Sequence, residues 1–277
     1  MFYKTFTTTI KKLIRSASFW LAFSVFVIIT IYGASEGFYI GDDAPDMVLK
    51  YHDFVECVTN SIVAKLLMYS APIFTVITVV LVLLRDYGDS FFEIEKAAGI
   101  SPFRYLAGRL TALALLNFLV LVFMNMLCLH YYVFTRGGVD GMSISSYLWE
   151  STVRLLRVDL FVGLPSLLFY IGLTYCVGTL FKNGIPAAVV SMGYTIMFYA
   201  SYLMFRRRIA AVFFEYLSPI PKKLRGFFQW FDTDRFELGL VHYDTSLGDM
   251  LLCVAFLTGC SLLFSLISYF RIRKRTV

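Results

Sequence analysis

Residues 105–135 read YLAGRLTALALLNFLVLVFMNMLCLHYYVFT, a long apolar run in which Arg109 is the only Lys, Arg, Asp or Glu. At 1.5 Å per residue, a helix of this length exceeds the roughly 30 Å of hydrocarbon in a lipid bilayer. Five other runs are also long enough to cross. The six predicted spans are Phe19–Ala34, Ile62–Leu84, Tyr105–Thr135, Val158–Phe181, Ile185–Phe205 and Met250–Phe270. The sequence therefore predicts an all-α integral membrane protein with six transmembrane helices.

The composition indicates lipid rather than water as the surroundings of this chain. Its residues are 58% hydrophobic and 16% charged, and the mean hydropathy is +0.71. A soluble domain has about a quarter of its residues charged. The formal net charge is +6, but the basic residues flank apolar spans, so we expect membrane lipid and no nucleic acid as a partner. Cys128, Cys176, Cys253 and Cys260 lie in the apolar runs, where they are interpreted as small apolar side chains.

Residues 1–18 predict an amphipathic helix in the membrane interface, and no cleavable signal peptide. Its apolar side chains share one helical face and its basic side chains share another. The apolar face holds Phe2, Phe6, Ile10, Leu13 and Ile14, and the basic face holds Lys4, Lys11, Lys12 and Arg15. Because the first span is short, we expect Leu13 and Ile14 to extend it.

Lysine and arginine predict the orientation of the spans. With the N-terminus inside, the inner segments hold Lys4, Lys11, Lys12, Arg15, Arg85, Lys96, Arg104, Arg109, Lys182, Arg271, Arg273, Lys274 and Arg275. The outer segment 35–61 holds six acids against Lys50. We therefore expect both termini in the cytoplasm, and the chain in the plasma membrane of a bacterium. Arg206–Arg208 are an exception on the outer side, in a long segment of the kind that follows the positive-inside rule weakly.

The outer segment 206–249 is predicted to form short interfacial or re-entrant helices between spans five and six. Ala210–Tyr216 and Leu224–Phe231 are apolar, and the sequence Ser218-Pro-Ile-Pro221 separates them. Neither stretch is long enough to cross a bilayer. Since the chain has no internal repeat and no soluble segment of domain size, residues 1–277 are interpreted as one transmembrane domain.

The inner segment 86–104, DYGDSFFEIEKAAGISPFR, is too polar to cross and too long for a plain turn. Asp89 or Ser90 can cap a short helix, with Glu93 in its first turns, where the helix dipole favours a negative charge. Gly99 is a natural stop, and Pro102 can begin the next helix. The pattern predicts a helix of about ten residues parallel to the membrane. From the residues alone it is either a docking surface for a cytosolic partner or a connector without one.

The chain resembles the permease subunit of a type-2 ATP-binding-cassette exporter, a class that moves drugs, peptides and lipid-linked glycans. The resemblance rests on the order of an amphipathic helix, a span, an acidic outer segment, a second span and an acidic inner helix that ends in Gly99-Ile-Ser-Pro102. It continues in the turn Gly178-Thr-Leu-Phe-Lys-Asn-Gly-Ile-Pro186 and in the helix-breaking Tyr216-Leu-Ser-Pro219.

The resemblance implies a coupling helix over Gly88–Gly99 that docks in a groove of a separate ATPase subunit. The implied docking residues are Asp89, Phe91, Phe92, Glu93, Glu95, Lys96 and Gly99, with Lys182 and Asn183 in a second cytoplasmic turn. It also implies a dimer with a second copy or a related permease, and export of an amphipathic cargo such as a peptide, a drug or a lipid by alternating access. The sequence has no G-x-x-x-x-G-K-[ST] phosphate loop, so ATP and Mg²⁺ are expected in the partner, with no cofactor or metal in this chain.

Two other classes of function remain as alternatives. A gradient-driven transporter, or a membrane sensor or immunity component that transports nothing, fits the same spans. An intramembrane enzyme is disfavoured: His52 and Cys57 could form a nucleophile pair, but neither H-E-x-x-H nor G-x-S-x-G is present. We therefore expect no enzymatic activity in this chain.

Four residues in the spans allow more than one interpretation. Lys65 is expected to snorkel outward, and Asp159 to pair locally with Arg154 or Arg157; a role toward substrate is the alternative for both. Pro72 and Pro165 are interpreted as ordinary membrane-helix prolines, or as hinges.

Overall fold

The structure is a computed structural model that describes residues 2–37, 62–88, 94, 97–136, 148–149, 152–153, 156, 159–204 and 247–274. Within these ranges all regular secondary structure is helical, and no strand occurs. The elements are α1 (Phe2–Ile14), α2 (Ala17–Gly37), α4 (Ile62–Gly88), α6 (Pro102–Arg136), the π-helical turn η1 (Asp159–Gly163), α8 (Leu164–Phe181), α9 (Gly184–Met204) and α12 (Leu247–Lys274).

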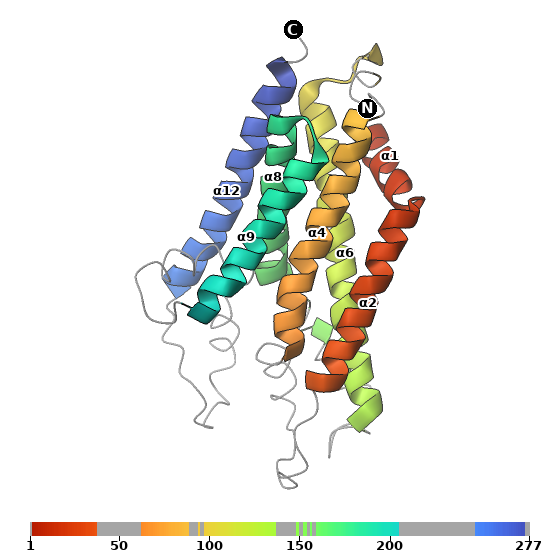
Figure 1. Cartoon of the computed structure of the whole chain (residues 1–277), viewed down its shortest axis with the longest axis vertical. Coiled ribbons are helices and arrows are strands. Elements are labelled where there is room, and N and C mark those ends of the chain that lie inside the picture. Colours follow the sequence, from red (N-terminus) through yellow and green to blue (C-terminus); the bar gives the residue numbers. More distant parts are fainter. Residues whose placement is uncertain are drawn as a thin grey trace.

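The long helices stand side by side along the long axis of the molecule (Figure 1). Helix α8 packs against α12, α9 and α4, while α2 packs on α4, and α1 on α6. Successive long helices run in opposite directions. As a result, α1, the C-terminal ends of α4 and α12, the N-terminal end of α6 and the turn between α8 and α9 meet at one end of the bundle (Figure 1). We call this the α1 end.

Four helical segments of the described chain are long and apolar enough to cross a membrane. They are Ala71–Gly88, Pro102–Cys128, Asp159–Phe181 and Val254–Lys274. The pair α1 and α2 adds a fifth crossing if the two are counted as one broken span. The apolar part of α9, Gly184–Ile196, is shorter. The predicted all-helical class is therefore confirmed, and four to five of the described helices could cross a membrane.

Helix α1 is a separate element, bent by 67° from α2. Leu13 and Ile14 do not continue the helix of the first span, because α1 ends at Ile14 and a new helix begins at Ala17. The Trp20 indole N–H donates to the Ile14 carbonyl at 2.6 Å, across the bend. We attribute the bend to the packing of α1. One face of this helix is buried, and its contact with α6 holds it away from the axis of α2.

The buried face of α1 is not its most apolar one. Thr5, Thr9 and Leu13 recur every four residues and are buried, whereas Phe2 and Ile14 are 41% and 43% exposed. The close approach depends on Gly108 of α6, where an added Cβ would lie 3.0 Å from the Thr5 Cβ. Small residues allow such contacts between membrane helices. Helix α1 therefore has an inner face of threonines and presents apolar side chains outward, as an interfacial helix does.

Several predicted elements lie outside the described residues. These are the outer stretches Ala210–Tyr216 and Leu224–Phe231, together with Arg206–Arg208. The two prolines are placed. Pro72 lies inside α4, and Pro165 lies in the first turn of α8, directly after the wider π turn of η1.

Candidate functional site

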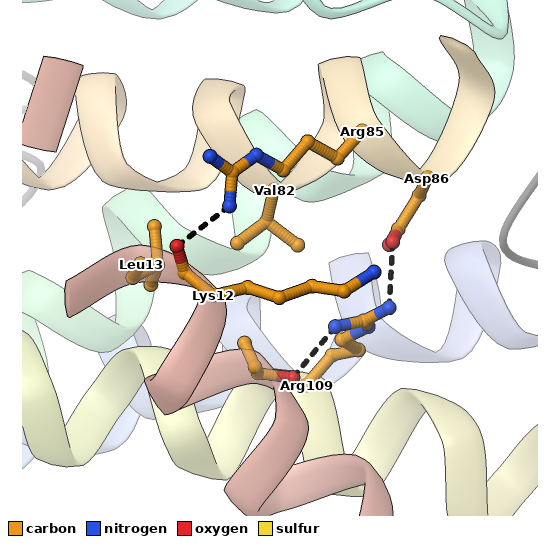
Figure 2. A pocket seen from close by; sticks show the side chains of 7 residues that line it. Lys12, Leu13, Val82, Arg85, Asp86 and Arg109 are labelled. Atoms are coloured by element: carbon orange, nitrogen blue, oxygen red, sulfur yellow. Dashed lines mark hydrogen bonds and ion pairs between the residues drawn. The ribbon is translucent and has the colours of Figure 1, made fainter. Parts of the chain in front are cut away.

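A buried ion pair joins α4 and α6 near the α1 end. Arg109 Nη2 lies 2.6 Å from Asp86 Oδ1, and the two residues are only 1% and 4% exposed. Arg109 Nη1 also donates to Thr9 Oγ1 of α1 at 2.7 Å, and the Tyr105 hydroxyl donates to Asp86 Oδ2 at 2.6 Å. Both carboxylate oxygens of Asp86 thus accept a hydrogen bond. We refer to Thr9, Asp86, Tyr105 and Arg109 as the Asp86–Arg109 cluster; Figure 2 shows the contact between Asp86 and Arg109.

Aromatic groups complete the surroundings of this cluster. The Arg109 guanidinium carbon lies 5.2 Å from the centre of the Tyr105 ring, and the buried Tyr175 of α8 interacts with Tyr105. A buried ion pair has to recover the free energy of desolvating two charges, and it does so best when other hydrogen bonds complete its partners. Because these bonds come from three helices, the cluster fixes α1, α4 and α6 relative to one another.

The sequence pattern does not indicate this pair. It predicts Asp86 and Arg109 as charges of an inner segment, whereas α4 extends to Gly88 and both side chains lie inside the bundle. The physical reason is that the two charges neutralise each other, so they can leave water together. One feature of the sequence is compatible with their pairing. Asp86 and Arg109 each lie within about two turns of a helix end, on two consecutive helices whose facing ends are joined by the docking segment.

Only part of the predicted docking segment is described. Asp89, Phe91, Phe92, Glu93, Glu95 and Lys96 lie outside the described residues. Further on, the Ala98 N–H donates to the Ile94 carbonyl at 3.0 Å, and Gly99 has φ +75°, a left-handed conformation that favours glycine. Helix α6 begins at Pro102. The predicted stop at Gly99 and start at Pro102 are therefore confirmed.

The predicted second turn is a two-residue connection between α8 and α9. Lys182 has φ 54°, in the left-handed region that often ends a helix, and Asn183 Oδ1 accepts the Ile185 N–H at 2.9 Å as an N-cap of α9. Both residues are exposed. The turn lies beside the end of α4, because a Cβ at Gly178 would meet Leu83 and one at Gly184 would meet Leu84. The remainder of the docking segment and this turn thus share the α1 end.

The described charges differ strongly between the two ends of the bundle. The basic residues of the α1 end are Lys4, Lys11, Lys12, Arg15, Arg85, Arg104, Arg109, Lys182, Arg271, Arg273 and Lys274, and Asp86 is its one described acid. Near the opposite ends of these helices the sequence carries Glu36, Lys65, Arg136, Asp159 and Asp249. Such an asymmetry is typical of a protein whose basic end faces the cytoplasm.

A second buried polar pair lies toward the opposite end, at the junction of η1 with α6. Asp159 is 2% exposed, and its Oδ1 accepts a hydrogen bond from the Asn125 amide at 2.5 Å. Within the described part of the chain, Oδ2 has no hydrogen-bond partner. The expected local partners Arg154 and Arg157 lie outside the described residues. Asp159 is thus a buried carboxyl at the start of a π-helical turn, in a segment that could cross a membrane. Functional residues are often found at such positions.

No protein family, curated protein or solved structure matches this chain. Among the described residues, no group of three or more His, Cys, Asp or Glu side chains could hold a metal ion. The main features of the described residues are a basic end, the exposed turn at Lys182 and Asn183, and the buried Asp86–Arg109 cluster.

Proposed function

We propose that this chain is the transmembrane permease subunit of an ATP-driven exporter of the ATP-binding-cassette type. In this proposal it crosses the membrane six times, with residues 2 and 274 on the cytoplasmic side. A separate ATPase subunit binds ATP and Mg²⁺, and a second permease, identical or related, completes the translocation pathway. The cargo is an amphipathic molecule such as a peptide, a drug or a lipid.

The observation that carries the proposal is the charge asymmetry of the bundle. The residues that flank the docking segment and the turn at Lys182 and Asn183 share the basic end. If that end is cytoplasmic, both connections face the compartment in which an ATPase operates. In the sequence, the acids Glu93 and Glu95 lie between the basic residues Arg85 and Arg104, and in this proposal they offer a partner a site of opposite charge to its surroundings.

The Asp86–Arg109 cluster gives the proposal a mechanical basis. It joins α4 and α6, the two helices between which the docking segment runs, and ties both to α1. A displacement of the docking segment would then move α4 and α6 together and would not simply separate one helix from the other. Packed helices of this kind move between discrete arrangements, as alternating access requires.

Cysteine labelling tests the orientation. In a Cys57→Ser background, a membrane-impermeant maleimide is expected to modify Glu36→Cys in intact cells, and Lys182→Cys only after the membrane is permeabilised. Three proposed crossings separate the two positions, so they belong on opposite sides. Modification of both positions from the same side would contradict the proposed crossings, and modification of Lys182→Cys alone would reverse the orientation.

Docking is tested with the affinity-tagged chain purified from native membranes in mild detergent. We expect a stoichiometric subunit that binds and hydrolyses ATP to co-purify. The double variant Glu93→Lys, Glu95→Lys is expected to lower the co-purified ATPase activity at least about tenfold, because placing like charges across an interface costs several kcal/mol.

The matched control is Glu36→Lys, Asp249→Lys, which makes the same change in charge at the opposite end. This control is expected to retain the ATPase. Equal retention by both variants would contradict docking at the acidic segment. Transport by the purified chain alone, with no ATPase present, would overturn the proposed function.

A gradient-driven transporter is the second candidate, and the Asn125–Asp159 pair favours it. A carboxyl inside the membrane with one unsatisfied oxygen can take up a proton or a cation. This alternative predicts gradient-dependent transport by the chain alone in vesicles, and loss of that transport in Asp159→Asn.

A further inference from the structure

A narrow hollow opens between α1, α4 and α6 next to the Asp86–Arg109 cluster (Figure 2). Its lining residues are Thr9, Lys12, Leu13, Val82, Arg85, Asp86 and Arg109. Three of them are cationic and one is a carboxylate, so the lining has an excess of two positive charges however the pairs form. An excess of positive charge in a pocket among membrane helices attracts an anion.

The cations of the hollow differ in how they are held. Arg109 is buried and directs its two terminal nitrogens to Asp86 and Thr9. Arg85 is half-buried and donates from Nη1 to the Lys12 carbonyl at 2.6 Å, its one hydrogen bond within the described residues. The Lys12 side chain, also half-buried, runs across the hollow toward Asp86 and Arg109 (Figure 2). Arg85 therefore keeps donors for an acceptor at the mouth of the hollow, beside Lys12.

The position of the hollow indicates the class of anion. Helix α1 combines exposed apolar side chains such as Phe2 and Ile14 with exposed basic ones such as Lys11, which places it at the level of the lipid headgroups. Leu13 and Val82 of the lining are themselves buried, so the apolar part of a ligand would lie on the exposed apolar side chains of α1, such as Ile14. A phospholipid meets both parts, because its phosphate carries the charge and its glycerol and acyl chains are apolar. Free phosphate meets only the charged part.

The hollow itself has a volume of about 10 Å³, which is room for one water molecule, so an anion can lie only at its mouth. We propose that this mouth binds the phosphate of an anionic phospholipid, with the half-buried Arg85 as the principal ligand and Lys12 as the second. A guanidinium can bind two phosphate oxygens at once, which an ammonium cannot do in the same way. Bound there, the lipid ties α1 to α4 through Lys12 and Arg85, next to the bonds that the cluster already makes. This inference requires a membrane but does not depend on the proposed exporter function.

Native mass spectrometry of the purified chain tests the proposal, with phosphatidylglycerol, phosphatidylcholine and inorganic phosphate as probes. Phosphatidylglycerol is expected to bind more tightly than phosphatidylcholine, and millimolar inorganic phosphate is expected not to displace it. Arg85→Gln should weaken phosphatidylglycerol binding about tenfold, since it removes the charge-assisted hydrogen bonds from the guanidinium to the phosphate. Lys12→Gln should have a smaller effect.

The matched control is Arg15→Gln, which removes one exposed positive charge at the same end but does not line the hollow. If Arg15→Gln weakens lipid binding as much as Arg85→Gln does, the attraction is diffuse and the proposal fails. Displacement of the lipid by inorganic phosphate would identify a free-phosphate site and overturn the lipid assignment. If Arg85→Gln does not fold, Arg85→Lys replaces it and is expected to weaken binding about twofold or more through loss of the two-oxygen contact.

Discussion

Replacing Asp86 with alanine is expected to lower the free energy of unfolding by about 3–5 kcal/mol. Arg109 would then remain 99% buried without the carboxylate that it contacts at 2.6 Å, and the Tyr105 hydroxyl would lose the acceptor to which it donates. Arg109→Ala should cost a similar amount, because it leaves Asp86 buried without its cation. The free energy can be measured by titrating the purified chain in mixed micelles with a denaturing detergent.

Two further variants separate the ion pair from a general effect of mutation. Arg104→Ala removes an exposed arginine from the first turn of the same helix, and we expect a change within about 0.5 kcal/mol. The double variant Asp86→Leu, Arg109→Leu leaves no uncompensated charge, so it should be more stable than either single leucine variant. Additive losses in the double variant would show that the two side chains do not act as a pair.

The helices could be predicted because the physical cause is strong. A backbone inside a bilayer must satisfy its own hydrogen bonds, and a long apolar run does so by forming a helix. The predicted span Ile62–Leu84 became α4, Ile62–Gly88, and the predicted start of α6 at Pro102 is the observed one. The errors lie at helix ends: Asp86 continues α4 beyond its apolar part, because a partner from another helix removes the cost of burying it.

The buried polar contacts could not be predicted, because their partners are far apart in the sequence. Asp159 was expected to pair with an arginine two to five residues away, yet the described contact is with Asn125, 34 residues earlier. Similarly, the sequence of residues 1–18 predicts an interfacial helix but does not indicate that Thr5 and Thr9 pack on α6. In the membrane an apolar face can remain against lipid, so hydrophobicity does not identify which face meets the protein.

Replacing Gly172 with valine is expected to destabilise the packing of α8 on α12 by about 1–3 kcal/mol. A Cβ at this position would lie 3.2 Å from both the carbonyl oxygen and the Oγ of Ser261, and 3.3 Å from its Cα. Two of these atoms belong to the backbone of α12, so no change of rotamer relieves the contact. The helices would have to separate, which stretches the 2.8 Å bond from Ser261 Oγ to the Leu168 carbonyl.

The control for this variant is Gly259→Val in α12, where an added Cβ meets nothing within 4 Å. Both variants place a β-branched residue in a helix, so the difference between their free energies of unfolding isolates the contact with Ser261. We expect Gly172→Val to be the less stable by at least about 1 kcal/mol. Helix α8 also contacts α4, and its Tyr175 lies next to Tyr105 of the Asp86–Arg109 cluster. If α8 separates from α12 but stays on α4, the cluster should therefore remain intact. Equal stability of the two glycine variants would mean that α8 and α12 do not approach as closely as their backbones indicate.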